Sequence, residues 1–155
     1  MSASERFIEE MGLISQQHGN ARIAGRIVGL LMIEGRELSL QDISERLGVS
    51  RASVSTNARQ LARSGTLRLA AHAGSRQDYY ELTGAPYFEM LDDLALQFQR
   101  HARVIAACIP SVHAERPDAS PRIRELSGFY EKSAEILQNW AIALRDEKTP
   151  GKELP

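Results

Sequence analysis

The stretch from residue 39 to residue 82 changes its hydrophobic period part-way along, and no other feature limits the possible folds as strongly. Its pieces are two short helical patterns joined at a glycine and two alternating patterns joined by a glycine-containing loop: residues 40–47, Gly48, 51–64, 66–70 and 78–82. Apolar residues three and four apart indicate helices, whereas alternation indicates strands. We therefore expect two short helices followed by a β-hairpin.

The two short helices have the features of a helix-turn-helix, in which two helices cross steeply through a tight turn. A small residue is needed where the helices cross, and Ser44 occupies that position. Gly48 suits the turn, because glycine tolerates the left-handed backbone. The apolar residues that would hold the pair together are Ile43, Leu47, Val49, Val54, Ala58 and Leu61.

The second of these helices begins with small polar residues, which points to DNA. The first turn of a recognition helix enters the major groove, where hydroxyl and guanidinium groups reach base edges or phosphates and bulky aliphatic side chains would clash. A helix N-terminus also favours a phosphate. The candidate DNA-contacting residues are Ser50, Arg51, Ala52, Ser53, Ser55, Thr56, Asn57, Arg59, Gln60 and Arg63, with Arg76 in the β-hairpin loop.

The charge distribution supports a phosphate-binding surface. The chain has a net charge of −1, yet residues 46–77 hold six arginines and no acidic residue. The other 13 basic residues share the rest of the chain with all 20 acidic ones. One cationic stretch in an otherwise acidic chain is typical of a nucleic-acid contact. The alternative is a solvated face that lacks acidic residues.

Arg76 is the only charged residue in the small loop at residues 72–76. A β-hairpin in this position is a wing, and its tip can lie beside the duplex while the recognition helix occupies the major groove. Narrow minor grooves concentrate negative potential and attract arginine. The alternatives are an arginine that is only solvated, or one paired with Asp78.

Helical patterns flank the predicted DNA-binding domain on both sides. Two helical patterns precede the helix-turn-helix, at residues 4–18, with Ser4 as the cap, and at residues 21–34. In the second pattern Gly25 and Gly29 leave room for another helix to approach closely. A third helix opens around Thr83 and Pro86 and stops at Pro110, and a polar loop leads to a last helix from Ser120.

The last two helices carry apolar seams with steps of three and four residues, as in coiled coils. The seam positions are Phe88, Leu91, Ala95, Phe98, Ala102, Ile105, Ile123, Leu126, Tyr130, Ser133, Leu137, Trp140 and Leu144. A small domain cannot bury so many by itself, so a homodimer is expected. We expect an N-terminal dimerisation helix (1–20), a winged helix-turn-helix (21–83), C-terminal dimerisation helices (84–147) and a frayed tail (148–155).

Several segments together resemble the MarR superfamily, and within it the GbsR-like branch. They are Phe7 to Gly12, Ala24 to Leu31, Leu38 to Leu47, Ser50 to Ser55, Gly74 to Arg76, and Tyr79 with Tyr80. The resemblance covers nearly the whole chain and implies a homodimeric repressor or activator of transcription with one winged helix per protomer. It also implies a small-molecule effector, with a choline-like cation as a candidate. Asn57 departs from the family pattern, which has an aliphatic residue there, so it either packs less well or turns toward DNA.

Other functions have weaker support in the sequence. There is no phosphate-binding loop, nucleophile elbow or paired acids suited to a cleft, so we expect no enzyme activity. The histidines lack a compact ligand spacing, and we expect no metal and no cofactor. Cys108 has apolar neighbours and is expected to be a buried structural thiol rather than a redox switch. The remaining alternative is a winged-helix adaptor that binds proteins and not DNA.

The chain has no apolar run near the roughly 20 residues that span a bilayer, and its first residues do not form a signal peptide. A single cysteine excludes an internal disulfide. We therefore expect a cytoplasmic protein with no membrane contact, whose partners are double-stranded DNA and a second copy of itself.

Overall fold

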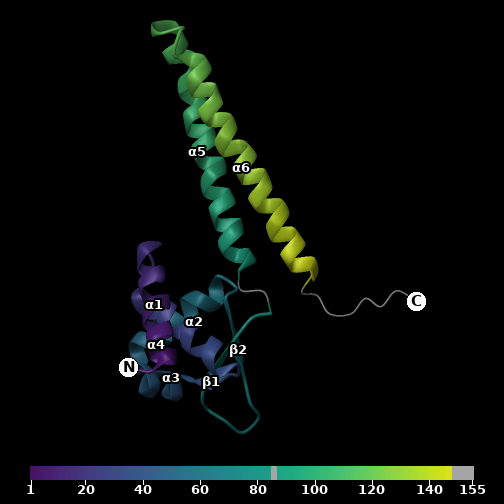
Figure 1. Cartoon of the computed structure of the whole chain (residues 1–155). Coiled ribbons are helices and arrows are strands. Elements are labelled where there is room, and N and C mark those ends of the chain that lie inside the picture. Colours follow the sequence, from purple (N-terminus) through teal and green to yellow (C-terminus); the bar gives the residue numbers. More distant parts are fainter. Residues whose placement is uncertain (85–86, 148–155) are drawn as a thin grey trace, which may run out of the picture. The chain divides into compact units, whose positions relative to one another are not determined.

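The computed structural model describes residues 1–84 and 87–147, and the chain divides into two compact units (Figure 1). The N-terminal unit comprises residues 1–86, and a helical hairpin follows within residues 87–155. The predicted helix-opening role of Pro86 and the predicted fraying from Lys148 lie outside the described residues. No helix in the described ranges is long and apolar enough to cross a lipid bilayer.

The N-terminal unit is a winged helix-turn-helix. Its elements, in order, are α1 (Ala3–Gln17), α2 (Arg22–Glu34), β1 (Leu38–Ser39), α3 (Leu40–Leu47), α4 (Arg51–Arg63), β2 (Leu67–Ala70) and β3 (Tyr79–Leu82). The strands form an antiparallel sheet in the order β1-β3-β2. The helix pair and the hairpin predicted from the two hydrophobic periods are both confirmed.

The core of this unit forms where α2, α3, α4 and the sheet meet. Its fully buried side chains include Ile27, Leu31, Ile43 and Val54, and Tyr80 of β3 closes it at the sheet. Burial raises the pKa of the Tyr80 hydroxyl. Each fully buried aliphatic side chain contributes about 1.5–3 kcal/mol, so this core fixes the position of α4.

Capping boxes begin two of the helices. The Ser39 hydroxyl accepts from the amide of Asp42 at 3.1 Å, and the Asp42 carboxylate accepts from the amide of Ser39 at 3.2 Å. This pair was expected from its spacing, and its hydrogen bonds lower the pKa of Asp42. In α1 the cap is Ser2, which pairs with Glu5, and not Ser4 as predicted.

The close approach of α1 to α2 depends on two glycines, as their spacing predicted. A Cβ atom at Gly25 would lie 2.1 Å from the carbonyl oxygen of Met11, and one at Gly29 would lie 3.2 Å from the Cα of Ile8. Side chains at these positions would force the helices apart. The N-terminal helix therefore packs along α2 within the N-terminal unit.

The strand β1 was not predicted. Its two residues, Leu38 and Ser39, pair with Tyr80 and Tyr79 of β3. The segment is too short to show an alternating pattern, and its partner is about 40 residues away in the sequence, so no local signal marks it. The pairing ties the start of α3 to the wing, and the amide of Leu40 also donates to the carbonyl of Asp78 at 3.1 Å.

The second unit is a hairpin of two long helices, α5 (Phe88–Glu115) and α6 (Ser120–Glu147). The prediction that Pro110 ends the first of them is wrong, because α5 continues past it for more than a turn. Contacts beyond the proline offset its missing N–H: Val112 is half-buried, and the His113 ring lies 2.9 Å from the Ser120 hydroxyl. The predicted polar loop shrinks to a tight turn at residues 116–119.

The contact between α5 and α6 is built mainly from small residues. The buried positions are Leu91, Ala95, Ala102, Ser120, Ser127, Ala134 and Ala141. The Ser127 hydroxyl donates to the carbonyl of Ala102 at 3.0 Å, and the rings of Phe98 and Tyr130 meet edge to face at 5.2 Å. In α5 the predicted seam positions Leu91, Ala95 and Ala102 are buried and Phe98 and Ile105 are half-buried, while the side chain of Phe88 is outside the described set. In α6 the predicted Ile123, Tyr130, Leu137 and Leu144 are half-buried, whereas Leu126 and Trp140 are exposed, and the buried positions are the neighbouring Ser127 and Ala141.

Candidate nucleic-acid interface

The turn before α4 is held from two sides, so the start of this helix has a fixed position. Gly48 adopts the left-handed conformation, with φ of 63°. The Ser44 hydroxyl donates to the carbonyl of Val49 at 2.6 Å, which gives the predicted small residue a bonding role as well. On the other side Arg26 of α2 donates to the carbonyl of Leu47 at 3.0 Å.

Arg26 also links this turn to α1. Its Nε lies 2.7 Å from a carboxylate oxygen of Glu9, and Arg22 donates to the other carboxylate oxygen at 2.6 Å. The two arginines lower the pKa of Glu9, Arg22 most strongly. The sequence does not reveal this link, because Glu9 and the two arginines belong to different predicted helices.

The first turn of α4 is open to a ligand. Ser50 is the N-cap, and its hydroxyl accepts from the amide of Ser53 at 3.2 Å. No acidic residue lies in the first turn. The remaining free amides of that turn carry partial positive charge and can receive a phosphate oxygen.

One face of α4 is buried and the opposite face is exposed. Val54 and Ala58 are fully buried, as predicted for the contact with α3. The exposed stripe steps by four, three and four residues through Ala52, Thr56, Arg59 and Arg63. Of the other predicted DNA-contacting residues, Ser50, Arg51, Gln60 and Arg76 are exposed, whereas Ser53, Ser55 and Asn57 are half-buried at the flanks.

Several side chains on α4 bond back to their own helix. Thr56 donates to the carbonyl of Ala52 at 3.0 Å, and the Nε of Arg59 donates to the carbonyl of Ser55 at 3.2 Å. These exposed bonds exchange easily with water or with a ligand. Asn57 donates to the carbonyl of Ser53 at 2.9 Å from a half-buried position, so in this structure its amide faces the helix.

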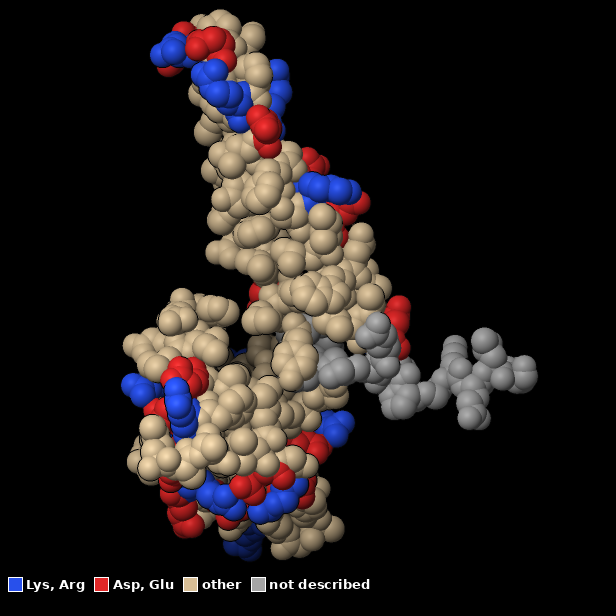
Figure 2. All heavy atoms as spheres, viewed as in Figure 1, with Lys and Arg blue, Asp and Glu red and all other residues tan. Residues whose placement is uncertain are grey.

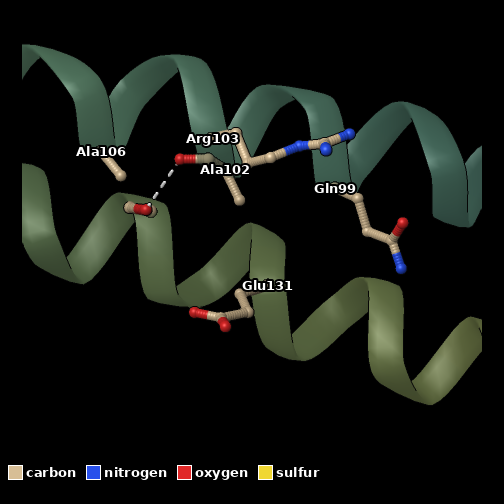
Figure 3. Close-up of a pocket in the computed structure, with 6 residues that line it drawn as sticks. Gln99, Ala102, Arg103, Ala106 and Glu131 are labelled. Atoms are coloured by element: carbon tan, nitrogen blue, oxygen red, sulfur yellow. Dashed lines mark hydrogen bonds between the residues drawn. The ribbon is translucent and has the colours of Figure 1, made fainter.

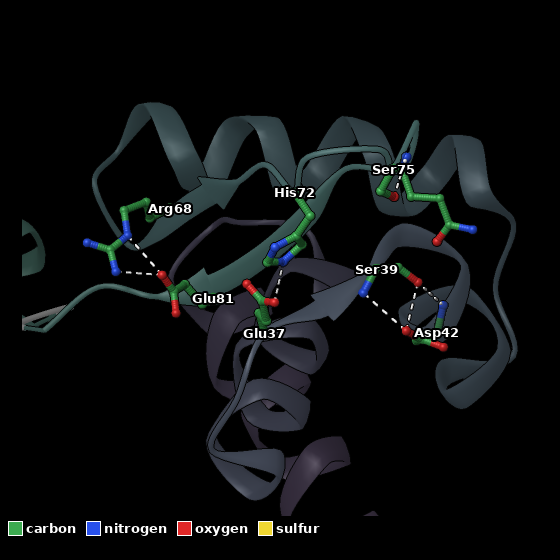
Figure 4. Close-up of polar contacts among 8 residues, drawn as sticks. Glu37, Ser39, Asp42, Arg68, His72, Ser75 and Glu81 are labelled. Carbon is green, nitrogen blue, oxygen red and sulfur yellow. Dashed lines mark hydrogen bonds and ion pairs between the residues drawn. The ribbon is translucent and has the colours of Figure 1, made fainter.

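Two of the six arginines in the arginine-rich stretch form ion pairs with carboxylates, so their positive charge is partly neutralised. Arg46 pairs with Glu34 of α2 at 2.5 Å, and Arg68 pairs with Glu81 on the neighbouring strand at 2.5 Å (Figure 4). Among the described residues the other four arginines of the stretch have no carboxylate partner: Arg51, Arg59, Arg63 and Arg76. Three of these lie on α4 and one on the wing, which concentrates the free positive charge on the candidate interface.

The wing loop is anchored at its base and open at its tip. The ring of His72 contacts the carboxylate of Glu37 and meets Tyr79 edge to face at 4.6 Å (Figure 4). Gly74 makes the bend with φ of 82°. Arg76 is exposed, and the described part of the chain shows no ion pair between it and Asp78.

A second surface feature lies on the hairpin. An open groove of about 430 Å³ is lined by Gln99, Ala102, Arg103, Ala106, Ser127 and Glu131 (Figure 3). Alanines form part of its floor, and Arg103 and Glu131 stand on opposite helices. The groove is open to solvent, unlike the enclosed sites that usually hold small molecules.

Cys108 is exposed in the chain, which corrects the prediction of a buried thiol. The prediction assumed that its apolar neighbours in sequence would surround it. On a helix, however, adjacent residues point about 100° apart, and Ala106 and Ala107 are themselves exposed.

These observations define a class of protein: a winged helix-turn-helix with an exposed polar and cationic recognition helix. Residues 21–70, from the start of α2 to the end of β2, match the model of the IclR helix-turn-helix domain. The chain is 35% identical over 77 residues to the HTH-type transcriptional regulator MmpR5 of Mycobacterium tuberculosis (strain ATCC 25618 / H37Rv). That match covers 49% of this chain and 47% of MmpR5, so the chain spans about half the length of this curated relative.

Among solved structures, the chain is similar to a crystal structure described as a transcriptional regulator. The TM-score is 0.68 at 25% sequence identity, and the match covers 94% of this chain and 99% of the other. The curated relative is therefore a helix-turn-helix transcriptional regulator, and the similar solved structure is described as a transcriptional regulator. None of these three supports the adaptor alternative, and the assignment to the MarR superfamily and its GbsR-like branch stays a prediction.

Proposed function

We propose that this protein is a sequence-specific DNA-binding regulator of transcription. The observation that carries the proposal is the exposed stripe of α4, where Thr56, Arg59 and Arg63 follow an N-cap with no acidic residue nearby. Two arginines and a hydroxyl on one helical face suit a major groove, because they can donate to base edges and neutralise phosphates. Arg76 on the wing would contact the backbone or the adjacent minor groove.

We further propose that the protein acts as a homodimer through α1, α5 and α6. Large apolar side chains are exposed on each of these helices, for example Phe7 and Ile14 on α1 and Trp140 on α6. Dimeric regulators bind two half-sites about one helical turn apart, so a dimer also fits the proposed DNA contact. Repression as the outcome, relief by a small molecule and a cytoplasmic location are proposed from the family resemblance and the proposed DNA contact.

Selection of bound fragments from genomic DNA would identify the operator, and fluorescence polarisation would then measure affinity. Replacing Thr56 or Ser53 with glutamate should remove the preference for the operator, at about 1–3 kcal/mol per lost base contact. The fold should survive, since both residues lie off the buried face of α4. Unchanged operator binding in both variants would place the sequence readout elsewhere.

Arg63→Ala distinguishes phosphate binding from an uncharged contact. It should weaken binding to all DNA sequences and lower the slope of log affinity against log salt by about one unit. Arg124→Ala is the matched control, because Arg124 is also an exposed helical arginine but lies on α6. Equal losses in the two variants would contradict a specific role for α4.

A further inference from the structure

The two sides of the helical hairpin differ in charge. Each of its helices has buried inner-seam positions, and the residues just before and just after these positions point to opposite sides of the hairpin. A step of one residue turns a helix by about 100°, and the two helices are antiparallel. The residue just before each inner-seam position therefore points to the same side of the hairpin in both helices, and the residue just after it points to the other side.

Apart from Arg122 near the turn, one side carries no Asp, Glu, Lys or Arg, and we call it the uncharged face. From α5 and α6 it contains Met90, Leu94, Gln97, His101, Val104, Cys108, Ser111, Leu126, Phe129, Ser133, Ile136, Trp140 and Ala143. The opposite side, the charged face, carries Asp92, Arg103, Arg124, Glu131, Glu135 and Arg145. Broad uncharged regions are visible on the hairpin in Figure 2, between charged groups at its tip and along one edge. The groove between Arg103 and Glu131 belongs to the charged face.

The uncharged face is large enough for a stable protein contact. Seven of its large apolar side chains are exposed by roughly a third to two thirds: Met90, Leu94, Val104, Leu126, Phe129, Ile136 and Trp140. At about 100 Å² each, they present on the order of 700 Å². A standard interface buries about 800 Å² per partner, whereas a monomer rarely leaves so large an apolar patch exposed.

The pattern along this face is suited to a second copy of the same chain. The bond from Ser127 to Ala102 sets the alignment of the two helices, and it places Gln97 and Ser133 at the same level. This polar row divides the apolar side chains into two groups. Met90, Leu94, Ile136 and Trp140 lie toward the start of α5, and Val104, Leu126 and Phe129 lie toward the turn.

We propose that the uncharged face is the contact between two copies, with both hairpins pointing the same way and Gln97 of each copy facing Ser133 of the other. The inference rests on the proposed homodimer and specifies its geometry. A two-fold axis along the hairpins pairs α5 of one copy with α6 of the other and matches polar row with polar row. A polar position in an apolar helical interface fixes the alignment, because a shifted arrangement would bury it against apolar side chains.

The DNA contact favours this alignment over the reverse one. The N-terminal unit is joined to the hairpin at the start of α5. With parallel hairpins, both N-terminal units are attached at the same end of the four-helix bundle. With antiparallel hairpins, they would be attached at opposite ends of helices of 28 residues, about 42 Å long. Only the first arrangement brings both recognition helices to one stretch of DNA through short connections.

Cysteine cross-linking tests the alignment in the full-length protein. In a Cys108→Ser background, one chain carries Gln97→Cys and a co-expressed chain with a different tag carries Ser133→Cys. Mild oxidation should give a covalent dimer that contains one chain of each kind, and little covalent dimer when either variant is present alone. Dominant cross-linking of the Gln97→Cys chain to itself would indicate antiparallel hairpins and overturn the proposal. The matched pair on the charged face, Gln99→Cys with Glu131→Cys, should give none.

A pair of leucine variants tests which face is covered. Leu126 on the uncharged face and Leu96 on the opposite side are both 47% exposed. Leu126→Glu should raise the dimer dissociation constant at least 100-fold in sedimentation experiments, and Leu96→Glu should leave it unchanged. A Leu126→Glu variant that remains dimeric would overturn the proposal, as would an absence of covalent dimer in every cysteine combination. Both assays are carried out without DNA, so their failure is distinguishable from failure of DNA binding.

Discussion

Replacing Gly25 with alanine is a direct test of how α1 is held on the N-terminal unit. The new Cβ would lie 2.1 Å from the carbonyl oxygen of Met11 and 2.6 Å from the Cβ of Ser15. A carbon and a carbonyl oxygen approach to about 3.3 Å at the closest. The obstacle is backbone and not a flexible side chain, so α1 must move away by about 1 Å.

The free-energy change follows from two opposing terms. Overpacking of this kind costs about 1–3 kcal/mol, and occasionally more. Alanine in a helix interior regains up to about 1 kcal/mol relative to glycine. The expected net loss is about 1–2 kcal/mol, which for a unit of 86 residues corresponds to a fall in Tm of roughly 4–16 °C.

Calorimetry of the full-length protein would measure this change, with two glycine variants for comparison. Gly128→Ala, in α6, adds a Cβ that meets nothing within 4 Å, so it should stabilise the hairpin by up to about 1 kcal/mol. Gly29→Ala adds one at 3.1 Å from the Met11 Cβ and should lie between the two. A Gly25→Ala protein as stable as the wild type would refute the inferred backbone contact between α1 and α2.

Two further predictions concern the wing and the capping box. Arg76→Ala should weaken binding to all DNA sequences and lower the salt slope by about one unit, with dimerisation and folding intact; affinity and slope equal to wild type would show that the wing does not touch DNA. The pKa of Asp42 is lowered from its ordinary value of 3.8, so its stabilising effect is present above that value and is lost as the pH falls through the folded-state pKa. In acid titrations, wild type should be more stable than Asp42→Asn near neutral pH and should lose this advantage below about pH 4; an advantage that persisted in acid would contradict the assignment.

The helix-turn-helix and the wing could be predicted because their signals are local. A glycine between two short amphipathic patterns and a change of period to two are visible within a window of about 40 residues. The capping pair of Ser39 with Asp42 and the glycine pair of α2 are local as well. The signal is in each case a spacing of three or four residues, although the glycines make their contact with a different helix, α1.

Features that depend on distant residues could not be predicted in the same way. The strand β1 exists only because β3 supplies its partner. The positive charge of Arg46 is neutralised in part by its ion pair with a carboxylate of α2. The contact from Arg26 to the turn before α4 joins elements 21 residues apart. A count of arginines along the sequence therefore overstates the cationic surface, and only the structure shows which arginines are left for DNA.

The predicted seam of α6 was partly misplaced, at Leu126 and Trp140, and the sequence shows why. Two stripes with steps of three and four residues run along this helix, one residue out of register with each other. One contains Ser127, Ala134 and Ala141, and the other contains Leu126, Phe129 and Trp140. A rule that assigns the largest apolar residues to the nearest helix mixes the two stripes, as the predicted seam did.

The observed choice between these stripes has a physical rationale. Small residues between α5 and α6 allow their backbones to approach closely, and the hydrogen bond from Ser127 to Ala102 crosses this contact. The side chains with most apolar surface are thereby left outside, on the uncharged face. A chain that folded only as a monomer would lose stability by this arrangement, because the parts of Phe129 and Trp140 that stay exposed gain no hydrophobic stabilisation from folding. The arrangement is favourable if a second hairpin covers them, and for this reason the exposed stripe of α6 is an argument for association and not an error of packing.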